Sequence, residues 1–361
     1  MDVLVVTVVH DPEDARIRHR QIAALREAGH HVTLAAAFTE YGRPIPDDID
    51  SIDIPRSQGS RRLAAMRAVR QLLRRRGRDF DVVLLHDPEL VVASAGLAVS
   101  GLVWDVHEDT AAAIRMKPWL PRGTRLIASR MVRAIERSAE RRMPLILAEE
   151  AYAGRFRRTH PIVRNSVVAS SVRAHGVAGH VVYLGRLTRP RGALDLIELG
   201  RRLAPDIEVH VIGHADHDCL AQVRAAHEEG TIRWYGFMPN NEALALLPDA
   251  LAGLSLLHEQ PNYAHSRPTK IIEYMAHGLP VITTPNPASS DLVERHDCGI
   301  VVPFGDVAAA ETAVRDLHAD RARRDRMGEA GHAAVVEHYS WEADADLFVR
   351  TLEKLAEQSS R

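Results

Sequence analysis

The chain has 361 residues, which is enough for two domains that each bury a core. It is 46% hydrophobic and 26% charged, which excludes a disordered or collagen-like chain. A net charge of −2 and an aromatic content of 5% argue against a nucleic-acid-binding protein. The two cysteines, Cys219 and Cys298, have no partner at metal-ligand spacing, so neither a disulfide framework nor a cysteine-based zinc site is expected. Asp2 stands where a secretory signal would carry a cation, and we predict a cytoplasmic protein.

The first half of the chain alternates short apolar runs with amphipathic stretches, which is the pattern of a parallel sheet wrapped by helices. Polar clusters follow two of the predicted strands, with His86 and Asp87 in the first cluster and His107 in the second. Because ligands bind at the carboxyl ends of parallel strands, these residues are candidates for a functional site. Strands are predicted at residues 3–9, 32–36, 80–85 and 102–106, and a helix at residues 17–28.

The same pattern restarts after residues 155–179, a stretch without a clear period that we interpret as a linker. The fold class is therefore α/β, with two Rossmann-like parallel-sheet domains predicted at residues 1–165 and 166–338. Strands are predicted at residues 180–184, 208–212, 252–257 and 280–283, and a helix at residues 192–203.

Charge is distributed unevenly along the chain. Residues 1–165 carry a net charge of +6, and the remainder carries −8. A helix is predicted at residues 61–76, from Arg61 to Arg76, within a segment that contains nine arginines and no acid between residues 56 and 78. One interpretation is a solvated helix face. The other is attachment to an anionic lipid surface, which would place the protein at the inner face of the membrane, or to a phosphorylated acceptor.

Residues 258–284 hold the strongest functional signal. A turn into a helix is predicted there, with Thr269 as its N-cap, Lys270 beside it and Gly278 at its end. A helix N-terminus with a lysine suits an anionic ligand, and Glu273 could accept hydrogen bonds from two ribose hydroxyls. The structural alternative is a capped helix whose Glu273 stabilises its own dipole.

This segment closely resembles the donor-binding signature of the retaining nucleotide-sugar glycosyltransferases of family 4, which have the GT-B fold. In that family a glutamate directly before a hydrophobic-Met-Ala-x-Gly-x-Pro-Val run binds the ribose of the donor, and Glu273 occupies that place. The resemblance extends over essentially the full chain and implies a terminal helix, residues 339–361, that crosses back to the first domain. Further positions that resemble the family's donor-binding landmarks are Gly185, Arg186, Arg191, Gly213, Phe237 and Met238.

Within that resemblance, Arg186 and Arg191 take the place of two cations that clamp the donor diphosphate. Preorganised cations stabilise a leaving diphosphate without a metal, and an arginine in place of the family's usual lysine at position 191 can still bind phosphate. The family often has an acid eight residues before Glu273, but this chain has His265 there. It resembles a subgroup lacking that first acid, in which backbone amides and residues such as Ser266 handle the sugar.

The first domain is expected to serve the acceptor. His10, Asp11 and Arg16 lie in a polar loop where many relatives have glycines, which suits a hydroxyl- or phosphate-bearing acceptor; the alternative is a solvated turn with Asp14 capping the next helix. Asp87 is a further candidate on the acceptor side. His107 is the catalytic candidate, because family members place a histidine there beside the reacting sugar. Its alternative role is structural, as a histidine among carboxylates.

The predicted function is transfer of a sugar from a nucleotide-diphosphate sugar to a hydroxyl acceptor, in a cleft between the two domains. The resemblance implies retention of configuration, and we predict no metal ion and no cofactor besides the donor. The spacing of Asp105 and His107 also suggests metal ligands, but the sequence offers no second convergent cluster. Two other functions stay open: a nucleotide-sugar epimerase or hydrolase on the same fold, and a non-catalytic sugar-nucleotide binding protein.

Overall fold

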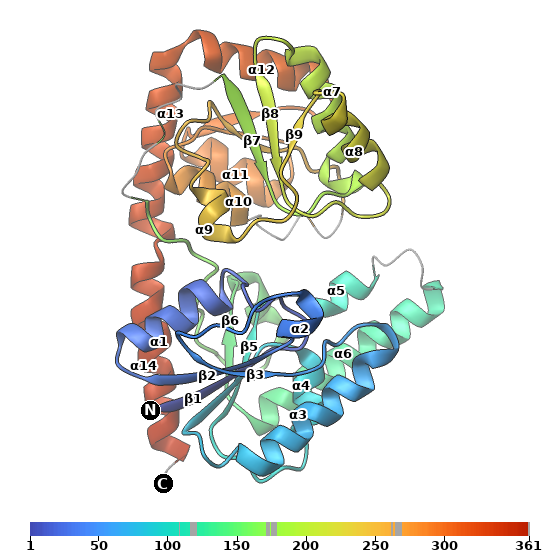
Figure 1. Cartoon of the computed structure of the whole chain (residues 1–361). Helices are drawn as coiled ribbons and strands as arrows, with labels where there is room; N and C mark the ends of the chain where they lie inside the picture. The colour runs from blue at the N-terminus through green and yellow to red at the C-terminus, as the bar shows by residue number, and fades with distance from the viewer. Residues whose placement is uncertain are drawn as a thin grey trace. The chain divides into compact units, whose positions relative to one another are not determined.

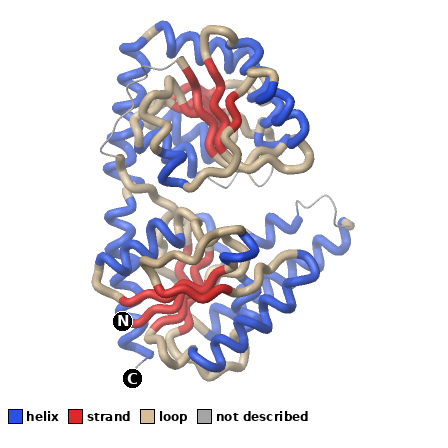
Figure 2. Tube along the Cα trace, viewed as in Figure 1, coloured by secondary structure: helices blue, strands red, loops and turns tan. Residues whose placement is uncertain are grey.

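The computed structural model describes residues 1–107, 109–115, 121–170, 174, 179–260, 263 and 269–359. The chain divides into two compact units, of which unit 1 comprises Met1–Asn165 and Trp341–Arg361 and unit 2 comprises Ser166–Ser340. Each unit contains a six-stranded parallel sheet with helices packed against it (Figure 1), and colouring by secondary structure separates the strands from the surrounding helices (Figure 2). The predicted α/β class with two Rossmann-like domains is confirmed. No helix in the described part of the chain has the length and apolar character needed to cross a membrane.

The sheet of unit 1 has the strand order β3-β2-β1-β4-β5-β6. Its strands are β1 (Asp2–Val6), β2 (His31–Ala36), β3 (Asp50–Asp53), β4 (Val82–Leu85), β5 (Leu102–Val106) and β6 (Leu145–Leu147). Its helices are a π-helical stretch at Ile17–Ile22 that continues as α1 (Ala23–Glu27), then α2 (Phe38–Tyr41), α3 (Arg62–Arg76), α4 (Pro88–Ala93), α5 (Thr110–Arg115), α6 (Arg122–Arg142) and α14 (Trp341–Ser359), with short 3-10 turns at Gly59–Arg61 and Glu150–Arg155.

The central strands of unit 1 are apolar on both faces because helices cover both faces of the sheet. In β1, Val3 and Val5 face one core cluster, whereas Leu4 and Val6 face the other. This alternation follows from the two-residue period of a strand, and in a parallel sheet both sets are buried. Polar side chains are therefore concentrated where the strands end, and the site begins there.

The sheet of unit 2 has the strand order β12-β11-β10-β7-β8-β9. Its strands are β7 (His180–Leu184), β8 (Glu208–Ile212), β9 (Arg233–Trp234), β10 (Gly253–Ser255), β11 (Val281–Thr283) and β12 (Gly299–Val301). Its helices are α7 (Ala193–Leu203), α8 (Leu220–Glu228), α9 (Asn240–Leu244), α10 (Thr269–Ala276), α11 (Pro287–Arg295), α12 (Val307–Ala319) and α13 (Arg321–Ala334), with a 3-10 turn at Arg189–Arg191 and a π-helical turn at Val335–Tyr339.

The terminal helix α14 belongs to unit 1, although the chain reaches it only after all of unit 2. Trp341, Phe348 and Leu352 are buried in the same core cluster as Val3 and Val5 of β1. At about 25 cal/mol per Å² of buried apolar surface, two large aromatic side chains and a leucine contribute several kcal/mol to the stability of unit 1. The core of unit 1 is therefore built from both ends of its sequence.

Candidate functional site

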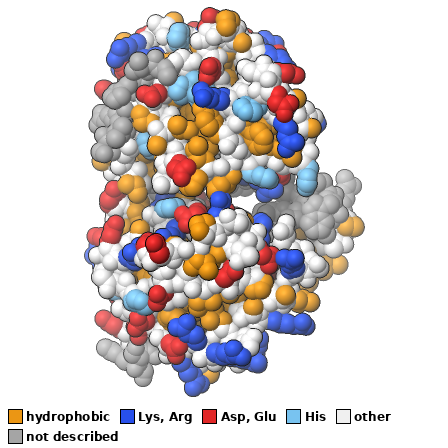
Figure 3. Space-filling view, viewed as in Figure 1, with side chains coloured by type: hydrophobic (Ala, Val, Ile, Leu, Met, Phe, Trp, Pro, Cys, Tyr) orange, Lys and Arg blue, Asp and Glu red, His pale blue; other side chains and the backbone are white. Residues whose placement is uncertain are grey.

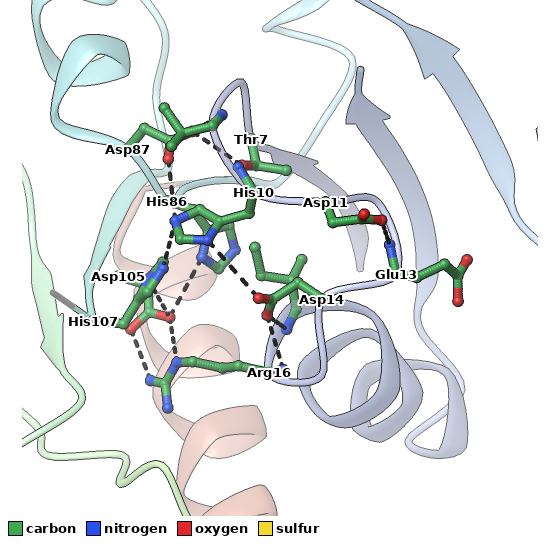
Figure 4. A network of polar contacts seen from close by, with 12 residues as sticks. Thr7, His10, Asp11, Glu13, Asp14, Arg16, His86, Asp87, Asp105 and His107 are labelled. Atoms are coloured by element: carbon green, nitrogen blue, oxygen red, sulfur yellow. Dashed lines mark hydrogen bonds and ion pairs between the residues drawn. The ribbon is translucent and has the colours of Figure 1, made fainter. Parts of the chain in front are cut away.

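Unit 1 gathers its polar candidates at the carboxyl ends of three neighbouring strands, β1, β4 and β5 (Figure 4). His10 lies in the loop after β1, His86 and Asp87 follow β4, and His107 directly follows β5. Since these strands are adjacent in the sheet, their loops meet, and the structure brings the predicted residues of all three loops into one network.

Asp105 is the centre of this network. It is fully buried, and its carboxylate accepts two hydrogen bonds from Arg16 (Nε–Oδ2 2.8 Å, Nη2–Oδ1 2.9 Å) and one from Gln21 Nε2 (2.8 Å). Burial alone would raise the pKa of this carboxyl. The charge of Arg16 and hydrogen bonding by His86 and Arg16 outweigh that effect, so the pKa lies well below its ordinary value. Asp105 is therefore a fixed negative charge behind His107.

Arg16 was predicted on the acceptor side, and it lies inside unit 1. Besides Asp105, its guanidinium donates to the carbonyl oxygens of Val163 (3.0 Å) and Arg164 (3.1 Å) and to Oδ1 of Asn165 (3.1 Å). These contacts indicate that Arg16 holds the Asp105 carboxylate in position. Asp14 Oδ1 accepts hydrogen bonds from the backbone N–H groups of Arg16 and Ile17, so the capping role considered for Asp14 is present.

His107 and His10 form a coupled pair. Their Nε2 atoms lie 2.8 Å apart, so one ring donates a hydrogen to the other. Burial, followed by the charge of His10, lowers the pKa of His107 to about 3. His107 is accordingly neutral at physiological pH. Asp87 Oδ1 lies 3.3 Å from His10 Nε2 and Asp14 Oδ2 lies 3.8 Å from His10 Nδ1, so two carboxylates face the His10 ring.

The two other acceptor-side candidates are held within unit 1 by different contacts. Asp87 is buried, and its Oδ2 accepts hydrogen bonds from Thr7 Oγ1 (3.0 Å) and the backbone N–H of Val8 (2.6 Å). Asp11 forms an ion pair with Arg43 (2.9 Å). Sequence reasoning missed Thr7 and Arg43, because neither belongs to a recognisable motif.

A cation could find three ligand atoms in this network. One atom each from His86, Asp105 and His107 lies within 4.8 Å of the others. However, both Asp105 oxygens already accept hydrogen bonds from Arg16 or Gln21, so a cation would compete with a buried guanidinium at this carboxylate. The arrangement therefore fits an arginine-bound carboxylate better than a metal ligand.

In unit 2 the carboxyl ends of β7 and β8 approach each other through glycines. A Cβ on Gly213 would lie 2.0 Å from the carbonyl oxygen of Gly185, so only glycine fits there. Gly185 itself has φ of 118°, in the region that favours glycine, and Gly213 N–H donates to the carbonyl of Gly236 (2.7 Å). The glycines therefore allow the backbones to approach each other closely at these strand ends.

Helix α10 is fixed to the same edge of the sheet. Tyr274 OH accepts a hydrogen bond from the backbone N–H of Leu184 (2.8 Å) and donates to the carbonyl of Leu254 (3.2 Å), which ties the helix to β7 and β10. The helix begins at Thr269, so this residue is the first of the helix rather than the predicted N-cap. Gly278 follows the helix with φ of 69°, as expected of a helix stop.

Lys270 is a buried cation without a hydrogen-bond acceptor. Its Nζ has no partner among the described residues, lies 3.5 Å from the centre of the Tyr183 ring, and is 3.4 Å from where a Cβ on Gly185 would lie. Burial lowers the pKa of this lysine well below its ordinary value, the charge of Arg191 lowers it further, and Glu273 opposes the shift. The ring of Tyr183 supplies some cation–π stabilisation but no counter-charge.

Glu273 lies one turn after Lys270 on α10 and is 7% exposed. Its Oε1 accepts a hydrogen bond from Asn240 Nδ2 (3.2 Å), the first residue of α9. Asn240 was not predicted, and only its position after Pro239 marked it as a helix start. The amide of Asn240 and the carboxylate of Glu273 therefore lie side by side in unit 2.

The two predicted clamp arginines have different surroundings. Arg186 is 62% exposed in its side chain and forms a two-bond ion pair with Asp216, with distances of 2.5 and 2.8 Å. Arg191 ends the turn Arg189–Arg191, which Thr188 caps, and its charge acts on Lys270. The positive charge of Arg191 therefore acts on Lys270, whereas Arg186 is paired with Asp216.

Comparison with known proteins finds similar glycosyltransferases. Residues 178–334 match the family model of the glycosyl transferases group 1. The chain is 26% identical to a phosphatidyl-myo-inositol mannosyltransferase from Mycobacterium leprae, over 97% of this chain and 92% of that protein. A sucrose-phosphate synthase from Thermosynechococcus elongatus matches with a TM-score of 0.74 and 17% identity, over 99% of both chains. HepE from Anabaena, in complex with UDP-glucose, matches with a TM-score of 0.71 and 15% identity, over 98% of this chain and all of that one.

The chain has the GT-B fold. These comparisons also support a glycosyltransferase, and the matched family model contains all the unit 2 residues described above. In this GT-B chain Phe237 is about half exposed and Met238 packs against the core of unit 2. His265 and Ser266 lie outside the described residues. The subgroup assignment, which rests on these two positions, stays a prediction.

Proposed function

We propose that this chain transfers a sugar from a nucleoside-diphosphate sugar to a hydroxyl acceptor, with retention of configuration and without a metal ion. The family match of residues 178–334 and the similarity to named glycosyltransferases support glycosyl transfer. HepE was crystallised with UDP-glucose, so a uridine diphosphate sugar is the first donor to test. The relative from Mycobacterium leprae is a phosphatidyl-myo-inositol mannosyltransferase, which favours a lipid-linked hydroxyl as the acceptor.

The observation that carries the proposal is the buried ammonium of Lys270, for which the described residues offer no hydrogen-bond acceptor. A protein that buries a cation without a counter-ion gains from any ligand that brings one, and a diphosphate brings two negative groups. Gly185, which has no side chain of its own, lies directly beside this ammonium. Arg191 adds a second positive charge, and the Glu273 carboxylate offers acceptors for ribose hydroxyls.

In the proposed reaction, the bond between the anomeric carbon and the donor phosphate breaks while the acceptor oxygen bonds to that carbon. Charge grows on the departing diphosphate, and Lys270 with Arg191 would stabilise it. The acceptor proton goes to the departing phosphate on the same face of the sugar, which retains the configuration. Unit 1 would supply His107 as a neutral hydrogen-bonding group toward the sugar, with Asp105 and His10 fixing its ring.

The test is release of nucleoside diphosphate from a panel of sugar nucleotides, with and without a lipid extract as acceptor. We expect release that depends on acceptor, persists in EDTA, and gives a product whose anomeric configuration by NMR equals that of the donor. Equal release without acceptor would favour the hydrolase, and conversion of the donor into another sugar nucleotide without net release, followed by NMR, would favour the epimerase. Binding that leaves the donor unchanged would favour a non-catalytic binding protein, and loss of activity in EDTA that added metal restores would overturn the metal-free route.

A further inference from the structure

A histidine–aspartate pair joins the loop after β10 to the start of α7. His258 lies three residues after the end of β10, and its Nε2 is 2.6 Å from Oδ2 of Asp195, the third residue of α7. A carboxylate only accepts hydrogen bonds, so Nε2 carries the hydrogen and donates it, whether the ring is neutral or charged. Asp195 also lies in the first turn of α7, where the helix dipole favours a carboxylate. The pair therefore fixes the beginning of α7 to the loop that follows another strand.

Two backbone contacts join the same two segments. The N–H of His258 donates to the carbonyl of Pro190 (2.9 Å), in the middle of the turn that ends at Arg191. Gly192 connects this turn to α7 with φ of 81°, and a Cβ on it would be 2.3 Å from the carbonyl oxygen of Leu256. His258 thus holds the turn through its backbone and the helix through its side chain, on either side of Arg191.

The charges around Arg191 explain why the turn needs this attachment. Burial and the charge of Arg191 both lower the pKa of Lys270, which means that the two cations act on each other. The N-terminus of α7 adds the positive end of a helix dipole directly after the turn. Repulsion between like charges favours movement of this partly exposed turn away from the buried lysine. The attachment to the β10 loop opposes that movement.

A histidine at the surface is not by itself evidence of a function. Figure 3 shows histidine side chains at several separate places on the surface of both units. His31 of unit 1, for example, also pairs with an aspartate, since its Nδ1 lies 3.2 Å from Oδ1 of Asp2. His258 differs in what its partners belong to, because its backbone and its side chain hold the two ends of the segment that carries Arg191.

We propose that His258 is a positioning residue of the donor site, which, paired with Asp195, keeps the turn that ends at Arg191 in place for the donor diphosphate. The inference rests on the proposed function, because it takes Arg191 and Lys270 as the cations that meet the diphosphate. The consequence is selective. Recognition of the phosphates depends on the His258–Asp195 pair, whereas recognition of the ribose, which is assigned to Glu273, does not.

The test compares UDP with uridine, which lacks the diphosphate. His258→Ala should bind UDP about tenfold more weakly than the wild type, which is the lower end of what one charge-assisted hydrogen bond contributes, and should bind uridine equally well. His258→Gln keeps an N–H donor for Asp195 and should retain most of the affinity for UDP. The matched control is His31→Ala, which should bind both ligands as the wild type does. A loss of uridine affinity as large as the loss of UDP affinity would assign His258 to the general stability of unit 2 and overturn the proposal.

A double-mutant cycle shows whether His258 acts through Arg191. Arg191→Ala should itself weaken UDP binding, and His258→Ala should add less than about twofold in that background, because the side chain that the pair positions is gone. Asp195→Ala should behave as His258→Ala does, and the two changes together should cost no more than either alone. An undiminished loss in the Arg191→Ala background would mean that His258 contacts the donor directly, which overturns the positioning role.

The position of the turn can also be followed without a ligand. The backbone N–H groups at positions 191–193 donate to carbonyls of the turn, and their hydrogen exchange should be about tenfold faster in His258→Ala, with exchange in α11 unchanged. Exchange at the turn equal to that of the wild type would overturn the proposal on its own. Faster exchange in a chain whose wild type binds no UDP would instead refute the proposed function, and with it the role of the pair in donor binding.

Discussion

Replacing Lys270 with methionine removes the buried charge and keeps a similar length of apolar chain. In the free protein the ammonium is buried, its Nζ has no hydrogen-bond partner among the described residues, and its pKa is lowered by burial and by Arg191. The unfolded chain therefore holds the proton more tightly than the folded one. Stability consequently rises with pH throughout the interval between the depressed folded pKa and the unfolded value near 10.5, by up to about 1.4 kcal/mol per pH unit.

Lys270→Met lacks this dependence, so it should unfold at higher urea concentration than the wild type at neutral pH. The gain is reduced by the lost cation–π contact with Tyr183, worth about 0.5–2 kcal/mol, and it should shrink as the pH approaches 10.5. Binding should change in the opposite direction. Charge-assisted hydrogen bonds contribute roughly 1.5–3 kcal/mol each, so UDP should bind the variant about ten- to a hundredfold more weakly.

Isothermal titration of UDP in buffers of different ionisation enthalpy makes the prediction specific. A diphosphate favours the charged lysine, so binding by the wild type should take up protons in the interval where the free lysine is partly neutral, and Lys270→Met should show no such uptake from this group. Lys354→Met, at an exposed position of α14, is the matched control and should behave as the wild type in every measurement. UDP affinity unchanged in Lys270→Met, or wild-type proton uptake absent at every pH from 7 to 10, would refute the reasoning.

Three further outcomes are expected. Glu273→Ala should weaken UDP binding about ten- to a hundredfold, because the ribose loses a charged hydrogen-bond acceptor. Calorimetry measures the affinity, with Glu294→Ala at an exposed position as the control. An affinity equal to that of the wild type would exclude Glu273 from the donor site. His107→Ala should lose most turnover while keeping its affinity for UDP. In the wild type the pKa of His107 is about 3, so this residue stays neutral and its titration should cause no fall in rate between pH 8 and pH 5. A loss of rate below pH 6.5 that disappears in His107→Asn would contradict this. Asp105→Asn should lower the free energy of unfolding by about 3–5 kcal/mol, because it leaves the Arg16 guanidinium buried without its counter-charge. Urea denaturation measures this loss, and UDP affinity shows whether the variant is still folded. A clearly smaller loss would contradict the prediction.

The sequence predicted the inner strands of both sheets and missed the outer ones. Continuous apolar runs indicated β1, β2, β4 and β5 in unit 1 and β7, β8, β10 and β11 in unit 2. The four missed strands, β3, β6, β9 and β12, are the outermost strands of the two sheets. An edge strand has one neighbour and is short: β9 has two residues, and β3 reads Asp-Ser-Ile-Asp with partial exposure. Neither β9 nor β3 therefore has an apolar run to detect. The other two, β6 (Leu-Ile-Leu) and β12 (Gly-Ile-Val), are apolar, but with three residues each they are too short to be recognised as strands.

The sequence predicted which residues belong to the candidate site better than it predicted their pKa values. The sequence placed His10 and His107 after predicted strands and Lys270 at the start of a predicted helix, and the structure has them in those places. The lowered pKa of Lys270, however, depends on its burial against Tyr183 and Gly185 and on the charge of Arg191. Likewise, His107 is neutral because it is buried beside His10, which lies 97 positions earlier in the sequence. Contacts between residues so distant in sequence follow from the fold and not from local pattern.

The position of α14 bears on how this chain is made. Unit 2 is one uninterrupted stretch, Ser166–Ser340, so it can complete its core while synthesis continues. Unit 1 begins first but cannot finish, because Trp341, Phe348 and Leu352 of its core are translated last. During that interval the apolar side chains that α14 will contact on α1, on the Ile17–Ile22 stretch and on β4 lack this covering helix. Nascent chains arrested before residue 341 should therefore present unit 1 as a chaperone client, whereas unit 2 should already resist protease.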